Sequence, residues 1–270
     1  SRRDSTRLVG LLDDADHIGR VAHPVDRSHD FNILLRYLMK TVKLHDATLS
    51  FTDVGTGPVL LLVHGFPLDH SMWQPQLESL SDTYRIIAPD LRGFGASGGA
   101  TETITMEQFA DDMAALLDAL GINEPITFCG LSMGGYVAWQ FWRRHAARLS
   151  RLILCDTRAI ADSEEVARGR AMMAERVLSE GSSIVAEAML PKLFAEATAR
   201  DDSNTVEATH RVMAATAPAA VAGALRGMAL RPDMTKELPN IDVPTLVICG
   251  EHDVISPPDE MRSIADKLPN

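Results

Sequence analysis

The chain has 270 residues, 46% of them hydrophobic, and a formal net charge of −11. This length allows one sizeable core, or one core with a lid. The negative charge argues against nucleic acid and anionic membranes as partners, because both favour basic surfaces. The longest apolar runs, such as Val59–Val63, are too short to cross a bilayer, and no secretory signal is recognised.

The cysteines and histidines bear on redox compartment and metal binding. Cys129, Cys155 and Cys249 each lie in a short apolar run, and an odd count at unrelated spacings fits neither a disulfide framework nor a zinc site. The nine histidines form no metal-binding spacing. We therefore expect free, buried thiols, a reducing cytoplasmic location, and neither metal nor cofactor.

Short β-branched runs alternate with helical stretches along the chain, which predicts an α/β fold with a mostly parallel sheet flanked by helices. The run Thr245–Cys249, like Val59–His64, is apolar throughout, as expected of a strand buried on both faces. A capping-box pattern at Thr105 and Gln108 begins a helix that Gly121 ends. The eight predicted strands are Arg7–Leu12, Val42–Leu44, Thr48–Asp53, Val59–His64, Arg85–Pro89, Ile126–Gly130, Leu149–Cys155 and Thr245–Gly250.

Residues 157–239 differ in character from the rest. They contain no convincing strand, and they hold six of the twelve methionines. Methionine adapts to irregular apolar surfaces, which fits either ordinary core packing or a helical lid over an apolar pocket. We predict a helical cap at 157–239 and a core made of 1–156 and 240–270. The predicted cap helices are Ser163–Glu180, Ser183–Leu190, Thr205–Thr216 and Ala219–Met228.

The strongest motif is Gly130-Leu131-Ser132-Met133-Gly134-Gly135, between a predicted strand and a predicted helix that covers Tyr136–His145. This is G-x-S-x-G in the strand-turn-helix context that presents a nucleophilic serine. The serine occupies a sharp turn, so residues two positions away must lack side chains for strand and helix to approach. The motif predicts Ser132 as a nucleophile.

A second segment, His64-Gly65-Phe66-Pro67, follows another apolar strand. We predict that the backbone N–H groups of Phe66 and Met133 form an oxyanion hole. His64 is interpreted as holding this loop by hydrogen bonds rather than as the catalytic base.

The run Gly93–Gly98 matches G-x-G-x-x-G, the pattern of a dinucleotide site. Such a site needs its helix to begin within the motif. The next predicted helix begins only near Thr105, so we interpret the run as a glycine-rich loop near the pocket.

Two aspartates compete for the role of the acid. Asp253 follows the strand that ends near Gly250, and Asp156 follows the strand that ends at Cys155. In the fold that carries this motif the acid comes after the serine and before the histidine. Asp253 is preferred, with Asp156 as the alternative.

Several of these segments together resemble the α/β-hydrolase superfamily, and more narrowly its 3-oxoadipate enol-lactonase and small carboxylesterase branch, near the cofactor-free haloperoxidases. The resemblance implies the α/β-hydrolase fold, with an eight-stranded sheet and a helical cap, and a serine–acid–histidine triad without cofactor. It is weakest in the cap. The segments are HGFPLDHSMW (64–73), APDLRGFGASG (88–98), FCGLSMGGYVA (128–138), LCDTRA (154–159) and GEHDVISPP (250–258).

The histidine of such a triad should follow Asp253, but no histidine does. Near the other end, a predicted strand at Arg7–Leu12 is followed by Asp16-His17 and an amphipathic helix that contains Phe31, Leu34, Leu35 and Leu38. We therefore infer a circular permutation, with residues 1–38 as the former C-terminal part and His17 as the base. His23 and His29 are interpreted as surface residues. The alternative is a truncated chain with an unrelated N-terminal extension.

The predicted function is hydrolysis of small carboxylic esters or lactones through an acyl-enzyme at Ser132, with His17 as base and Asp253 as acid. The expected partner is a small-molecule substrate, with neither nucleic acid nor a membrane. Carbon–carbon bond hydrolysis or perhydrolysis on the same triad is the first alternative. A non-catalytic ligand-binding protein with this fold is the second.

Overall fold

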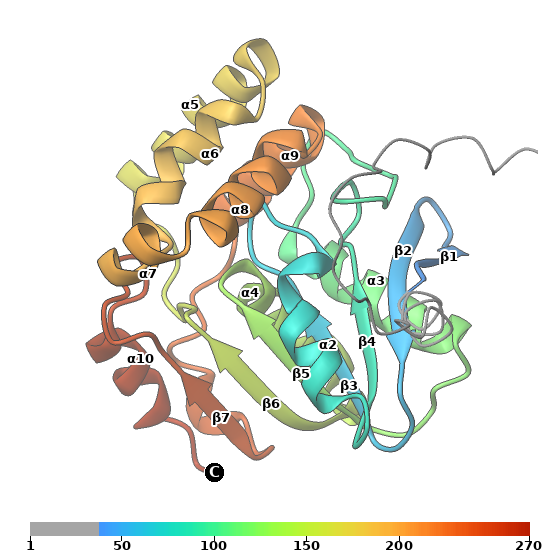
Figure 1. Ribbon diagram of the computed structural model, residues 1–270. Helices are drawn as coiled ribbons and strands as arrows, with labels where there is room; N and C mark the ends of the chain where they lie inside the picture. The colour runs from blue at the N-terminus through green and yellow to red at the C-terminus, as the bar shows by residue number, and fades with distance from the viewer. Residues whose placement is uncertain (1–37) are drawn as a thin grey trace, which may run out of the picture. The chain divides into compact units, whose positions relative to one another are not determined.

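A computed structural model describes residues 38–270, which contain one seven-stranded sheet in the order β1-β2-β4-β3-β5-β6-β7 (Figure 1). β1, β2 and β4 pair antiparallel, and β4, β3, β5, β6 and β7 pair parallel. The prediction of a mostly parallel sheet is confirmed, while the eighth predicted strand, Arg7–Leu12, lies outside the described residues. The strands are β1 (Lys40–Lys43), β2 (Thr48–Val54), β3 (Val59–Val63), β4 (Arg85–Pro89), β5 (Ile126–Leu131), β6 (Leu149–Cys155) and β7 (Thr245–Ile248).

The predicted helices that fall within residues 38–270 are present, among them α10 after the Pro257-Pro258 pair, whereas the amphipathic helix predicted near Phe31 lies outside the described residues. Two short helices were not predicted. Thr105 caps α3 by accepting a hydrogen bond from the Gln108 N–H at 3.1 Å, as the capping pattern predicts. α4 begins at Met133, directly after the serine, rather than at Tyr136. The unpredicted helices are α2 and α7. The α-helices are α2 (Gln74–Leu80), α3 (Met106–Ala119), α4 (Met133–His145), α5 (Glu164–Glu180), α6 (Ser183–Met189), α7 (Glu196–Asp201), α8 (Ser203–Ala215), α9 (Pro218–Ala229) and α10 (Pro258–Ala265).

Strand β3 lies in the middle of the sheet and is buried at every residue. Leu60 and Leu62 pack into a cluster with Leu77 of α2 on one face. Leu61 and Val63 join the larger core on the other face, where α3 and α4 pack. The unbroken apolar run is therefore explained by cover on both faces.

Strand β7 does not meet the same expectation. Val247 packs against the core, but Leu246 is 55% exposed and Ile248 is 46% exposed. The prediction of burial on both faces is therefore wrong for this strand within residues 38–270. The physical reason is that Leu246 and Ile248 lie on the opposite face from Val247, and that face of β7 is exposed among the described residues.

The segment 157–239 contains helices and no strand. Figure 1 shows α5 to α9 gathered beyond one end of the sheet, and eight residues of α9 are buried. The division into a core and a cap domain remains a prediction. Among residues 38–270 no single helix is long and apolar enough to cross a membrane. Only α8 and α9 taken together pass that test of length and composition, and they meet at 91°.

Candidate active site

Ser132 occupies the turn between β5 and α4, with φ = +52° and ψ = −109°. Positive φ is costly for a residue with a side chain, so the surrounding structure must hold this turn. The Ser132 N–H donates to the Cys155 carbonyl at 2.9 Å, and the Ser132 carbonyl accepts from the Thr157 hydroxyl at 2.8 Å. The end of β6 therefore fixes both backbone groups of the serine.

The glycines around Ser132 are required by close contacts. A Cβ on Gly130 would overlap the backbone of Gly134, and one on Gly134 would overlap the Val63 carbonyl. A Cβ on Gly135 would overlap the side chain of Thr157. The prediction that these positions must lack side chains is confirmed.

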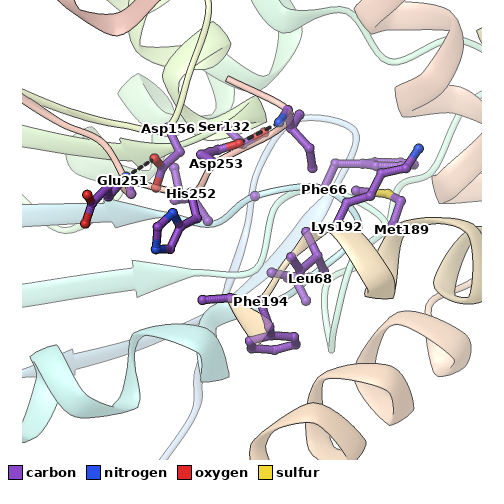
Figure 2. A pocket seen from close by; sticks show the side chains of 16 residues that line it. Phe66, Leu68, Ser132, Asp156, Met189, Lys192, Phe194, Glu251, His252 and Asp253 are labelled. Carbon is purple, nitrogen blue, oxygen red and sulfur yellow. Dashed lines mark hydrogen bonds between the residues drawn. The ribbon is translucent and has the colours of Figure 1, made fainter. Parts of the chain in front are cut away.

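Ser132 lines a pocket of about 290 Å³ (Figure 2). Asp156 and Asp253 line the same pocket, so the structure brings together both of the competing acids. Most of the remaining wall is apolar and comes from the core and from the helical segment 157–239. Its apolar side chains are Phe66, Leu68, Leu131, Met189, Leu193, Phe194, Ala195 and Ile255.

The two predicted oxyanion donors lie on opposite sides of the serine in sequence. Phe66 follows β3 and lines the pocket, and Met133 is the first residue of α4. Neither backbone N–H donates to another group within the described part of the chain. A helix N-terminus also favours negative charge. Both amides are therefore free to bind an oxyanion.

His64 holds the loop that carries Phe66. Its Nε2 accepts from the Leu91 N–H at 3.0 Å and its Nδ1 lies 2.9 Å from the Gly65 carbonyl, to which it donates. The side chain is fully buried, and burial lowers the pKa of this histidine. The interpretation of His64 as a residue that holds the loop is confirmed.

Asp253 lies in the loop after β7. Its Oδ1 accepts from the N–H groups of Ile255 and Ser256 at 2.6 and 2.8 Å. These two backbone donors fix the orientation of the Asp253 carboxyl, as the acid of a triad requires.

Asp156 also has a positive φ, +43°, and its Oδ1 accepts from the Gly250 N–H at 2.8 Å. Burial, followed by the charge of Asp253 and a hydrogen bond with it, raises the pKa of Asp156. The two acids, alternatives on the sequence alone, both line the pocket in the structure.

The predicted base, His17, lies outside the described residues, as do His23 and His29. One imidazole that sequence analysis did not weigh lines the pocket: His252, beside Asp253 in the chain. Its place in the segment GEHD was the available signal.

Asp69, His70 and Asp90 form a second polar cluster whose ligand-type atoms lie within 4.8 Å of one another. Asp90 Oδ1 accepts from the backbone N–H of His70 and lies 2.7 Å from its Nδ1, and Oδ2 accepts from the Ala96 N–H. A cation would have to displace these bonds. They tie the glycine-rich run 93–98 to the end of β4. No residue of that run lines the pocket, but Phe94 packs edge-on against the pocket residue Phe66, so the run lies near the pocket as predicted.

Residues 58–270 match the family model described as "alpha/beta hydrolase fold". The chain belongs to the α/β-hydrolase family. A curated relative, 3-oxoadipate enol-lactonase 1 of Acinetobacter baylyi, is 31% identical over 199 residues, which cover 74% of this chain and 73% of the relative. The predictions of the fold family and of a hydrolase are confirmed.

Two solved structures of related enzymes have the same fold as this chain. A thermophilic esterase from Thermogutta terrifontis is 46% identical, with a TM-score of 0.83 over 86% of this chain and 87% of that one. The enol-lactonase from Burkholderia xenovorans LB400 is 32% identical, with a TM-score of 0.79 over 85% of this chain and 88% of that one. This α/β-hydrolase therefore lies among relatives that are esterases and enol-lactonases.

Proposed function

We propose that this α/β-hydrolase cleaves small carboxylic esters or lactones through an acyl-enzyme formed on Ser132. The observation that carries the proposal is the strained Ser132, held at the N-terminus of α4, in an apolar pocket that also contains Asp253. A pocket of about 290 Å³ suits a small substrate. The names of the esterase and enol-lactonase relatives support the same class of bond.

We assign the base to His17 and the acid to Asp253. The assignment requires the N-terminal segment to reach the β7 side of the sheet, with Arg7–Leu12 as the next parallel strand. Within residues 38–270 no strand pairs with the outer edge of β7, and this edge and the exposed side chains of Leu246 and Ile248 support the arrangement. In it, residues 1–38 complete the core that residues 39–156 and 240–270 begin, and 157–239 act as the cap.

The proposed reaction has two halves. His17 takes the proton of the Ser132 hydroxyl as its oxygen attacks the substrate carbonyl, and the oxyanion binds the N–H groups of Phe66 and Met133. The imidazolium then returns the proton to the departing alkoxide. Water hydrolyses the acyl-enzyme through the same base and restores the serine.

Substitution of Ser132 by alanine tests the nucleophile. We expect Ser132→Ala to keep its fold and to lose activity on p-nitrophenyl acetate by at least about a thousand-fold, because triad members act only together. A fluorophosphonate probe should label the parent protein and not the variant. Substantial turnover by folded Ser132→Ala would refute the assignment.

A pair of histidine variants tests the base. We expect His17→Ala to be nearly as damaging as Ser132→Ala, and the matched variant His252→Ala, which alters the imidazole already in the pocket, to retain far more activity. The opposite order would transfer the role to His252. Restored activity on mixing Ser132→Ala with His17→Ala chains would instead mean that His17 acts across a swapped dimer.

A further inference from the structure

Asp156 and Ser132 are the two described residues other than glycine with positive φ. Asp156 lies at the end of β6, and its own backbone is held on both sides. Its N–H donates to the Ile248 carbonyl at 3.0 Å, and its carbonyl accepts from the buried hydroxyl of Ser256 at 3.0 Å. Strain of this kind persists where the surrounding contacts require it and concentrates at functional sites.

The neighbours of Asp156 in the chain hold the nucleophile. The carbonyl of Cys155 accepts from the Ser132 N–H, and the hydroxyl of Thr157 donates to the Ser132 carbonyl. Between them, the side chain of Asp156 points to the other loop and accepts from the Gly250 N–H at 2.8 Å. Three consecutive residues thus bridge the serine turn and the loop that carries Asp253.

The carboxyl groups of Asp156 and Asp253 face the same pocket, and Asp156 accepts from the N–H of Gly250, three residues before Asp253, so the charge of Asp253 raises the pKa of Asp156 after burial does. A shared proton lets two neighbouring carboxylates form a hydrogen bond, whereas two ionised ones repel each other. Asp253 already accepts two backbone N–H groups. Asp156 accepts one, and burial raises its pKa.

We propose, on the basis of the proposed esterase function, that Asp156 is a positioning residue that ties the Ser132 turn to the Asp253 loop. In this proposal the Asp156 carboxyl pairs with the Asp253 carboxyl and shares a proton with it at low pH. At higher pH Asp156 is ionised and adds a second negative charge beside Asp253, the acid of the triad. The second charge favours the imidazolium of the base, so the ionisation of Asp156 changes the pH at which the triad becomes active.

The other ionisable groups around Asp156 do not duplicate this role. Burial, and then the charge of Asp156, raise the pKa of the Cys249 thiol to about 11, so this thiol stays neutral in the working range. Glu251 and His252 line the pocket from the same loop, and Lys192 lines it from the helical segment. Glu251 is exposed and offers a matched carboxylate in the same pocket.

The test compares Asp156→Asn with Glu251→Gln. Asparagine can still accept from the Gly250 N–H and donate to Asp253, so it imitates protonated Asp156. We expect Asp156→Asn to move the acid limb of kcat/KM for p-nitrophenyl acetate to lower pH by roughly 0.5 to 1 unit, because it removes a charge beside the acid. Glu251→Gln should move it much less. Asp156→Ala, which also loses the Gly250 contact, should lower kcat by about ten- to a hundred-fold.

Stability against pH gives a readout that does not need catalysis. A carboxyl whose pKa is raised on folding stabilises the protein at low pH and loses that contribution as pH rises through the folded pKa. Parent protein should therefore lose stability relative to Asp156→Asn as pH rises. An unmoved acid limb, or equal shifts for Asp156→Asn and Glu251→Gln, would overturn the proposal. An inactive parent that still shows the stability difference would refute the esterase function and leave the carboxyl pair supported.

Discussion

Replacement of Gly134 by alanine should damage both stability and catalysis, because this glycine touches the neighbouring strand. An alanine Cβ there would overlap the Val63 carbonyl, which is backbone in the middle of the sheet and cannot move aside. Overpacking of a tight interior costs about 1–3 kcal/mol, and the helix gains at most about 1 kcal/mol from replacing glycine. We expect a net loss of about 1–2 kcal/mol in the free energy of unfolding.

The catalytic loss should exceed the stability loss. Gly134 is two residues after Ser132, so relief of the overlap must shift the serine turn, and a misplacement of about 1 Å costs on the order of a hundred-fold in rate. Gly169 provides the control, since it lies within α5 and a Cβ there meets nothing within 4 Å. Gly169→Ala should keep full activity and gain up to about 1 kcal/mol. Urea unfolding and kcat on p-nitrophenyl acetate measure both effects, and parent-like values for Gly134→Ala would refute the packing argument.

Two further predictions concern polar groups outside the pocket. Arg92 is buried and donates bidentate hydrogen bonds to Asp112, so Arg92→Met should cost about 3–5 kcal/mol in urea unfolding. Arg176→Met breaks an exposed pair with Glu180 and should leave urea unfolding almost unchanged. Similar losses for the two variants would contradict this. Burial opposes the charged form of His70, but the hydrogen bond and charge of Asp90 outweigh it and raise the pKa of His70 above 6.5. The ion pair of His70 with Asp90 therefore stabilises the fold fully below pH 6.5, and this stabilisation is lost as pH rises through the pKa of His70 in the folded protein. His70→Gln should remove this part of the pH dependence of stability, as measured by thermal unfolding across the same pH range. Identical pH dependence in the two proteins would count against the ion pair.

The nucleophile turn could be predicted from sequence because its constraints are local. Gly130 avoids an overlap with Gly134 four residues later, and the strand, turn and helix that the motif joins are consecutive in the chain, although Gly134 and Gly135 also avoid overlaps with the distant Val63 and Thr157. The cap of α3 was predictable for the same reason, since the Thr105 hydroxyl and the Gln108 N–H are three residues apart. The short helices α2 and α7 were missed because six or seven residues show too little periodicity.

Features that depend on sheet order were harder to predict. The run Thr245–Cys249 resembles a buried central strand, but its apolar character does not reveal whether a neighbour covers each face. The proximity of Asp156 and Asp253 likewise follows from the parallel pairing of β6 with β7, in which Cys155 lies opposite Ile248. Nothing within either segment indicates that the two carboxyl groups meet.

The order of the strands explains why the proposed base should come from the β7 side. Ser132 follows β5, Asp156 follows β6 and Asp253 follows β7, so the serine and the two acidic groups follow three adjacent parallel strands in order. The carboxyl ends of parallel strands meet at one edge, which is where sites form in open α/β sheets. A histidine on a strand beyond β7 would approach Asp253 first, and Asp253 would orient it toward Ser132. A base from the β3 side would have to cross the Phe66 loop, where His64 is already fixed by hydrogen bonds to the backbone.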